Sequence, residues 1–247
     1  MGSIHNDIAR YLRQQKELVG DTTWADVSRA VEPMAAASLQ QEEEPVKTEA
    51  QRQPSWADAE SLEELNSLIC DCLDCPLGTT RTNFVFGSGN PNADLMIIGE
   101  APGADEDKQG LPFVGRAGQL LTKILGAIEI ERDSVYICNI LKCRPPNNRK
   151  PLTSETDTCE PYLWKQIELV QPRYILALGL TAANTLLKTK DTMTNLRGSL
   201  HDYHGIPTMV TYHPAALLRN PEWKKATWDD VQHLQTLIQE TDTSTTP

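Results

Sequence analysis

The chain lacks long apolar runs, an excess of basic residues and a secretory leader, and each absence excludes a class of protein. Its 247 residues are 39% hydrophobic, and the apolar run Tyr174–Leu178 is far too short to cross a membrane. The first residues form neither a basic nor an apolar segment, so we expect no secretion and a cytoplasmic location. With 23 Lys and Arg against 34 Asp and Glu, the chain is not a highly basic chromatin-type binder. A membrane protein and a secreted disulfide scaffold are excluded as well.

The negative charge is concentrated in the first quarter of the chain. Residues 1–64 hold 6 basic residues against 13 acidic ones, and subtraction from the chain totals leaves 17 against 21 for the remainder. A near-neutral body can still present a local basic face, so the acidic total does not exclude a nucleic-acid partner.

Residues 1–60 are predicted to form an acidic, low-complexity extension that is largely disordered. Its polar composition with scattered prolines cannot bury enough apolar surface to offset the entropy of ordering. One amphipathic helix is possible near the start, where Ile4, Ile8 and Leu12 recur at helical spacing. Such a helix could dock a protein partner, although a solvated extension without a partner is the favoured interpretation.

Residues 61–240 are predicted to form one domain, followed by a disordered tail at residues 241–247. The domain begins at residues 61–64, Ser-Leu-Glu-Glu, which fit a helix capping box. Short apolar strands then alternate with helices, which indicates a mostly parallel sheet covered on both faces. The expected strands lie at residues 95–98, 135–140, 174–178 and 207–212, and the main helices at 117–128, 155–170, 181–187 and 229–239.

Six cysteines are present, and four of them have the spacing of a metal or cluster site. A C-x2-C pair with two distant cysteines can bind Zn²⁺ or an iron–sulfur cluster, and spacing alone does not choose between the two. Cys138 lies in an apolar strand and fits a free buried thiol, whereas Cys70 is either a free thiol or a rival ligand. The four candidate ligands are Cys72, Cys75, Cys143 and Cys159.

Two segments after the first strand have the residue types of a ligand site. Residues 99–103, Gly-Glu-Ala-Pro-Gly, form a tight turn whose glycines let the backbone approach a ligand. Residues 110–118 lead into a helix and contain Phe113, which either stacks on a flat ligand or fills the core. In a parallel sheet the ligand lies beyond the carboxyl ends of the strands, which is where both segments fall.

Two further segments follow later strands. Asn139 ends a strand ahead of Lys142 and Arg144, an arrangement suited to reading a polar edge beside a phosphate. His213 leaves the last predicted strand and is followed by an apolar and basic loop at residues 214–221. Each segment alone is weak, because a single His or Asn is usually structural.

Taken together, the four segments resemble the family 4 uracil-DNA glycosylases, in which the same motifs occur in the same order. The four candidate cysteine ligands match the iron–sulfur ligands of that family. The resemblance covers about residues 66–240 and implies a three-layer α/β/α fold with a central, mostly parallel four-stranded sheet. It also implies a [4Fe–4S] cluster and uracil-containing DNA, single- or double-stranded, as substrate. We expect a monomer with no membrane association.

The implied activity is a monofunctional one: uracil is flipped out of DNA and its N-glycosidic bond is hydrolysed, leaving an abasic site for base excision repair. The resemblance assigns Asn139 to the uracil edge, His213 to uracil O2 and Glu100 to the water or the developing positive sugar. Glu106 lies either where a thymine methyl would intrude or in a solvated acidic loop. The implied catalytic residues are Glu100, Asn139 and His213; the implied substrate-binding residues are Gly99, Glu106, Phe113, Asn139 and His213. The implied DNA contacts are Lys142, Arg144, Arg149, Leu217, Leu218 and Arg219.

Other functions remain open at this point. The chain could be a glycosylase for another deaminated base such as hypoxanthine, although Asn139 and His213 together favour uracil. It could also be a non-catalytic iron–sulfur protein that binds DNA or senses redox state. A purely structural zinc module would explain the cysteines and leave the other motifs unused.

Overall fold

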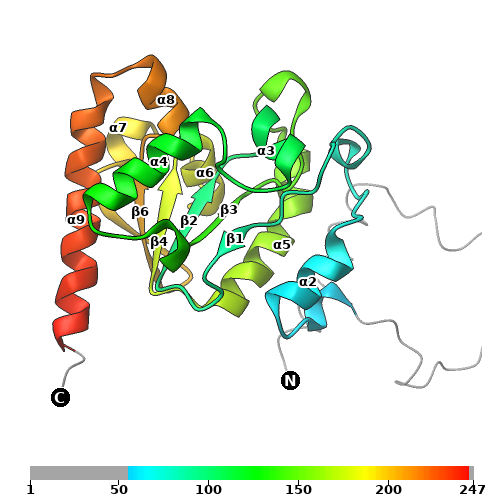
Figure 1. The fold of residues 1–247 in the computed structure, drawn as a ribbon, viewed down its shortest axis with the longest axis horizontal. Coiled ribbons are helices and arrows are strands. Elements are labelled where there is room, and N and C mark those ends of the chain that lie inside the picture. The colour runs from blue at the N-terminus through cyan, green and yellow to red at the C-terminus, as the bar shows by residue number, and fades with distance from the viewer. Residues whose placement is uncertain (1–54, 245–247) are drawn as a thin grey trace, which may run out of the picture. The chain divides into compact units, whose positions relative to one another are not determined.

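The structure, a computed structural model, describes residues 55–244 (Figure 1). The predictions for the extension up to residue 54, including its amphipathic helix, and for residues 245–247 lie outside the described residues. No helix in the described part of the chain combines the length and the apolar character that a membrane crossing requires.

The described residues form strands and helices in alternation, as predicted. The strands are β1 (Ser88–Gly89), β2 (Leu95–Gly99), β3 (Tyr136–Asn139), β4 (Tyr174–Leu178), β5 (Leu200–Tyr203) and β6 (Ile206–Thr211). The α-helices are α2 (Leu62–Ile69), α3 (Ala104–Gln109), α4 (Arg116–Ala127), α5 (Thr153–Val170), α6 (Leu180–Leu186), α7 (Met193–Leu196), α8 (Pro214–Arg219) and α9 (Trp223–Ser244). Short 3-10 helices are η3 (Trp56–Asp58), η4 (Pro76–Thr79), η5 (Arg132–Ser134) and η6 (Pro146–Asn148).

The sheet has six strands in the order β1-β3-β2-β4-β6-β5, so the prediction of four strands was too low. The four predicted strands, β2, β3, β4 and β6, form the parallel centre of the sheet. The two additional strands, β1 and β5, pair antiparallel at the edges. In the central register Gly99 of β2 lies opposite Asn139 of β3, so the ends of these strands meet at one edge of the sheet.

Alternate residues of the central strands point into two separate apolar cores, which makes the domain three layers thick (Figure 1). On one face Met96 and Ile98 of β2 belong to the core that contains α2, α5 and α6. On the other face Leu95 and Ile97 pack with Leu121 of α4 and with residues of α9. The predicted α/β/α arrangement is therefore confirmed.

The domain boundaries differ slightly from those expected. The Ser61 hydroxyl accepts the N–H of Glu64 at 3.1 Å, which is the predicted cap of α2. The carboxylate of Glu64, however, accepts the N–H of Glu60 rather than that of Ser61. The last helix, α9, begins at Trp223 and ends at Ser244, so it includes four residues that were assigned to a disordered tail.

Candidate active site

A cavity of about 350 Å³ opens at the carboxyl ends of the parallel strands. It is lined from β3, from the segments that follow β2 and β6, and from the loop before α5. Most of the predicted catalytic, substrate-binding and DNA-binding residues meet here, although they lie up to 119 positions apart in the chain, from Glu100 to Arg219. The predicted residues in the lining are Glu100, Glu106, Phe113, Asn139, Arg149, His213 and Arg219.

Gly99 allows the walls of this cavity to come together. A methyl group added at Gly99 would lie 2.3 Å from Oδ1 of Asn139 and 2.6 Å from Cζ of Phe113. Both distances are far below van der Waals contact, so any side chain at this position would displace one of the two neighbours. Gly99 is thus required by the packing of the site, which its position in the sequence did not reveal.

Asn139 carries an unsatisfied polar atom. The residue is 2% exposed, and its Oδ1 is buried without a hydrogen-bond partner. A buried acceptor without a partner costs about 1–3 kcal/mol, so it is rarely retained without a reason. Because Asn139 lines the cavity, a ligand with an N–H group on its edge would supply the missing donor.

Phe113 is held in an uncommon backbone conformation beside Asn139. Its φ of 53° lies in the left-handed region, and a side chain on Gly118 would come within 1.7 Å of the Phe113 carbonyl oxygen. Nη2 of Arg132 donates to the carbonyl of Pro112 at 2.8 Å, which fixes the start of the same turn. The ring stacks on His213 with centroids 5.4 Å apart and planes 29° apart, so two predicted site residues form one wall.

Glu106 organises the turn that presents Phe113. Its Oε1 accepts the backbone N–H groups of Val114 and Gly115, both at 3.0 Å, and its Oε2 accepts that of Gly103 at 3.1 Å. The carboxylate therefore joins the start of α3 to the loop before α4, in addition to lining the cavity. This role could not be read from the sequence, because the partners are backbone groups brought close only by folding.

His213 caps the N-terminus of α8 and is neutral over a wide pH range. Its Nδ1 accepts the backbone N–H of Ala215 at 3.1 Å, so the ring proton of the neutral form is on Nε2. Burial of the ring, with the positive charge of Arg219 as a second cause, lowers the pKa of His213 to about 4. The side chain is thus a neutral N–H donor that lines the cavity.

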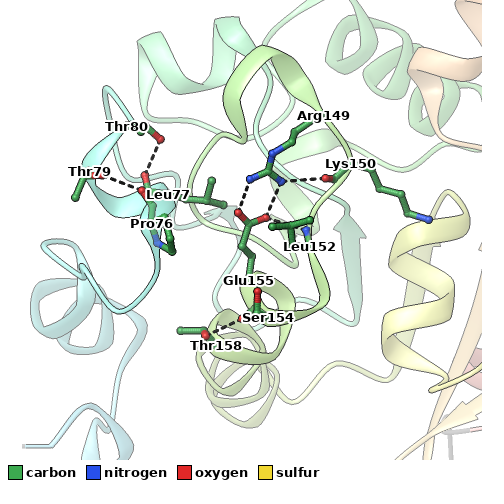
Figure 2. A network of polar contacts seen from close by, with 10 residues as sticks. All are labelled: Pro76, Leu77, Thr79, Thr80, Arg149, Lys150, Leu152, Ser154, Glu155 and Thr158. Carbon is green, nitrogen blue, oxygen red and sulfur yellow. Dashed lines mark hydrogen bonds and ion pairs between the residues drawn. The ribbon is translucent and has the colours of Figure 1, made fainter.

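The predicted DNA contact Arg149 lies at the rim of the cavity and is paired with a buried carboxylate. Its guanidinium donates to Glu155 through two bonds, of 2.9 and 2.5 Å, and to the carbonyl of Lys150 at 3.1 Å (Figure 2). Glu155 is 2% exposed and also accepts the N–H of Leu152 at the start of α5. The hydrogen bond from Arg149 is the main reason that the pKa of Glu155 is lowered. Arg144, in the same loop, donates to Oδ1 of Asn148.

Two of the predicted DNA contacts are wrong, because the structure places them in the interior. Lys142 is fully buried, and its Nζ donates to the carbonyl of Asn139 at 2.8 Å and to Gln166. Leu217 is 1% exposed, so it cannot enter a DNA groove. By contrast, Leu218 is 40% exposed and Arg219 is also exposed, so these two remain available at the surface of α8.

The four candidate cysteine ligands come from three segments that pack on the same side of the sheet. Cys72 and Cys75 follow α2, Cys143 follows β3, and Cys159 lies within α5. Cys72 and Cys75 both act on the pKa of Cys143, and Cys143 and Cys75 both act on that of Cys159, so the thiols lie near one another. Burial raises the pKa of Cys143, and it raises that of Cys159 to about 12. We call these four side chains the cysteine group.

The donor set of the cysteine group fits an iron–sulfur cluster or Zn²⁺, since both are bound by four thiolates. Within residues 55–244, however, no three His, Cys, Asp or Glu side chains are already arranged around a metal position. Cys138 is buried in β3, outside the group, as a free thiol.

Arg81 is a residue that the sequence analysis missed. Its Nη1 donates to the sulfur of Cys143 at 3.3 Å and to the carbonyl of Cys72 at 2.6 Å, and its Nη2 donates to the carbonyl of Cys70 at 2.8 Å. A cation placed here favours negative charge on the cysteine group. An isolated arginine after a C-x2-C pair gives no signal in a single sequence that would have identified it.

Comparison with known proteins identifies the class to which this fold and site belong. The sequence model of the Uracil DNA glycosylase superfamily matches residues 86–232, so the chain belongs to the uracil-DNA glycosylase superfamily. The chain is 42% identical over 183 residues to the type-4 uracil-DNA glycosylase of Thermotoga maritima, across 72% of this chain and 95% of the relative. It is 45% identical over 168 residues to the type-4 enzyme of Pyrobaculum aerophilum, across 65% of this chain and 86% of the relative.

A type-5 uracil-DNA glycosylase of Pyrobaculum aerophilum is less similar, with 33% identity over 146 residues, 52% of this chain and 64% of the relative. Within the superfamily the chain therefore belongs with the type-4 proteins, as its motifs predicted.

Proposed function

We propose that this chain removes uracil from DNA by hydrolysing the bond between uracil N1 and deoxyribose C1′. The products are free uracil and an abasic site, which is the first step of base excision repair. The observation that carries this proposal is the buried, unpartnered Oδ1 of Asn139 in a cavity walled by Phe113 and His213. The type-4 family membership supports it independently.

Asn139 is proposed to read the base. Uracil presents an N–H donor at N3 beside an acceptor at O4, which complements the oxygen and nitrogen of one amide group. Cytosine presents the opposite pattern at the same two positions, so the same amide disfavours it. Phe113 is proposed to stack on the flipped base, and its fixed backbone makes the ring available before the base arrives.

His213 is proposed to stabilise the leaving group. Negative charge develops on uracil O2 as the glycosidic bond breaks, and the N–H of Nε2 is the donor that the neutral ring offers. A donor held ready in this way contributes about 3–4 kcal/mol by analogy with oxyanion sites. Because the ring is neutral, donation to O2 leaves no buried positive charge on the ring to be compensated.

Water is proposed to be the nucleophile. Glu100 follows β2 and lines the cavity, where a carboxylate either orients water or stabilises the positive charge that develops on the sugar. No lysine is among the described residues that line the cavity, so no amine is placed to form a Schiff base with the sugar. These features support a monofunctional hydrolase.

The exposed residues beside the cavity are proposed to hold the DNA. Flipping a nucleotide costs a few kcal/mol of stacking and pairing, which contacts at the rim must offset. Leu218 and Arg219 of α8 are exposed and are proposed to enter the minor groove. The exposed Arg149 and the partly exposed Arg144 are proposed to contact phosphates. Single- and double-stranded DNA are both proposed substrates.

The cysteine group is proposed to hold a [4Fe–4S] cluster through Cys72, Cys75, Cys143 and Cys159. When bound, the cluster would link α2, the loop after β3 and α5. Hydrolysis of the glycosidic bond transfers no electrons, so we propose that the cluster has a structural role. It would fix the loop between Asn139 and the basic residues at the rim.

The proposal is tested by measuring uracil release from single-stranded and duplex oligonucleotides, with wild type compared with His213→Ala. We expect uracil release by wild type and a loss of about a hundredfold or more in the variant. The same assay with hypoxanthine-containing DNA tests the alternative substrate. A folded wild-type protein that releases no uracil would overturn the proposal.

A further inference from the structure

Lys142 is fully buried where the chain leaves β3, and within residues 55–244 its ammonium group donates hydrogen bonds only to neutral oxygen atoms. Nζ donates to the carbonyl of Asn139 at 2.8 Å and to Oε1 of Gln166. No carboxylate within the described part of the chain pairs with this ammonium. Burying an ammonium group is costly, so its retention at this position requires a specific reason.

Gln166 is the second acceptor of the ammonium group. It is fully buried in α5, and its Nε2 donates to the carbonyl of Phe86 at 3.0 Å and to the hydroxyl of Tyr136 at 3.2 Å. All polar atoms of the Gln166 amide are thus used, and the amide cannot rotate without losing bonds. Lys142 therefore connects the end of β3 to a rigid point on α5.

The backbone of Lys142 faces the cysteine group. Its backbone N–H is one of the groups that lower the pKa of the Cys159 thiol, against the effect of burial, and the next residue in the chain is Cys143. Its carbonyl accepts the N–H of Val85 at 2.8 Å. Lys142 is thus hydrogen-bonded to the carbonyl of Asn139 through its side chain, and its main chain continues directly into Cys143 of the cysteine group.

We propose that Lys142 is a positioning residue that holds the base-reading amide of Asn139 in place and connects it to the cysteine group. The inference rests on the proposed function, because it requires that Asn139 reads uracil. Lys142 acts through the Asn139 carbonyl: this bond sets the main chain at the end of β3 and hence the direction of the amide. The buried positive charge next to that strand end also favours the negative charge that uracil gains as it leaves.

Lys142→Met tests the proposal, because methionine retains most of the side-chain volume and removes the donors. We expect kcat for uracil release to fall by about tenfold or more, since small misplacements in a catalytic site have effects of this size. Inhibition by free uracil should weaken by a similar factor. Affinity for abasic-site DNA should keep its dependence on salt, whereas loss of a phosphate contact would lower the logarithmic slope by about 0.9.

Lys165→Met is the matched control. Lys165 lies on α5 next to Gln166 and is only 8% exposed, but its ammonium group pairs with Glu168. This variant should keep wild-type uracil release and uracil inhibition. Thermal unfolding and the visible absorption of the cluster, measured on both variants, separate a folded Lys142→Met protein from an unfolded one.

If Lys142→Met does not fold, the same measurements are made on Gln166→Leu, which removes one of the two acceptors of the ammonium group and leaves the carbonyl of Asn139. The same reductions in kcat and in uracil inhibition are expected. Wild-type kcat and uracil inhibition in the folded variant would overturn the inference, and so would a reduced salt slope. Absence of uracil release by the wild-type protein would instead overturn the proposed function. The two failures are distinguished because the first is seen in the variants and the second in the wild-type protein.

Discussion

Gly99 and Asn139 lie opposite each other on β2 and β3, and a methyl group on Gly99 would lie only 2.3 Å from the amide oxygen of Asn139. Gly99→Ala should therefore displace the amide that is proposed to read the base and reduce uracil release by about a hundredfold. Gly126→Ala is the control, because a methyl group at Gly126 meets no atom within 4 Å. Oligonucleotide cleavage assays with both variants check the prediction, and wild-type activity in Gly99→Ala would contradict it.

Asn139→Asp should change which base is released. A carboxylate accepts the amino group of cytosine but offers no donor to uracil O4, so cytosine release should appear. Uracil release should fall by about a hundredfold or more, since a polar site discriminates strongly against a mismatched hydrogen-bonding partner. Asn92→Asp, at an exposed position, should leave both activities unchanged. Base release from oligonucleotides with a single uracil or cytosine is the measurement, and unchanged base preference would count against the role of Asn139.

The neutral state of His213 predicts a particular pH dependence. Its pKa is lowered from 6.5 to about 4, so uracil release should show no inflection from this residue between pH 5 and 8. An unfolded imidazole takes up its proton near pH 6.5, so between that value and about 4 the unfolded state binds more protons. His213 should thus reduce the stability of the fold as the pH falls through this window.

NMR titration of the His213 ring measures this pKa directly. Arg219→Gln removes the second cause of the shift and should move the pKa upward, toward the ordinary value. Titration of His213 near pH 6.5 in the wild-type protein would show that the ring is not held neutral.

The pair formed by Glu155 and Arg149 predicts a loss of stability when the carboxylate is replaced (Figure 2). Glu155→Gln should lower the free energy of unfolding by about 1–3 kcal/mol at pH 7, since charge-assisted hydrogen bonds are lost from a buried group. Glu168→Gln, whose carboxylate is 55% exposed, should change it by less than about 0.5 kcal/mol.

The same pair also makes the stability of the fold depend on pH, but here the charged form of the group is favoured in the folded state, whereas for His213 the neutral form is favoured. Because the pKa of Glu155 is lowered in the folded state, its stabilising effect is present above the ordinary carboxyl range and is lost as the pH falls through the folded value. Urea unfolding at neutral and acidic pH should show a smaller difference for Glu155→Gln than for wild type. An equal difference in both proteins would rule out this contribution.

Cys159→Ser should abolish the visible absorption of an iron–sulfur cluster, whereas Cys70→Ser and Cys138→Ser should retain it. Cys159 is in electrostatic range of two other members of the cysteine group, and Cys138 is a free thiol in β3. Iron, sulfide and zinc analysis of the purified proteins completes the measurement. A colourless wild-type protein with one equivalent of zinc would identify the group as a zinc site instead.

The centre of the fold could be predicted from the sequence because its signals are local. The apolar runs of β2, β3, β4 and β6 lie between helical patterns, which is the pattern of parallel strands in the middle of a sheet. The edge strands were missed for a physical reason. β1 is two residues long, and in β5 only Tyr203 is buried, so neither produces an apolar run.

The sequence predicted many of the residues that meet at the cavity, but it did not show what surrounds each of them. Lys142 and Leu217 illustrate the limit, since both belong to motifs at the cavity and both are buried by segments distant in the sequence. A single sequence shows the charge of a lysine but not what covers it. Likewise, two of the three backbone partners of Glu106 come from a loop eight and nine residues away, and nothing in the local sequence indicates their approach.

The turn at Phe113 stores conformational energy. A non-glycine residue at a φ of 53° costs on the order of 1–3 kcal/mol, and the hydrogen bonds of Glu106 with Val114 and of Arg132 with Pro112 hold the turn in this conformation. Because these bonds are all made within the protein, a base that enters the pocket need not wait for this turn to rearrange. Opening of the DNA is then the slow step. We therefore expect uracil in a single strand or in a weak base pair to be released faster than uracil in a stable base pair.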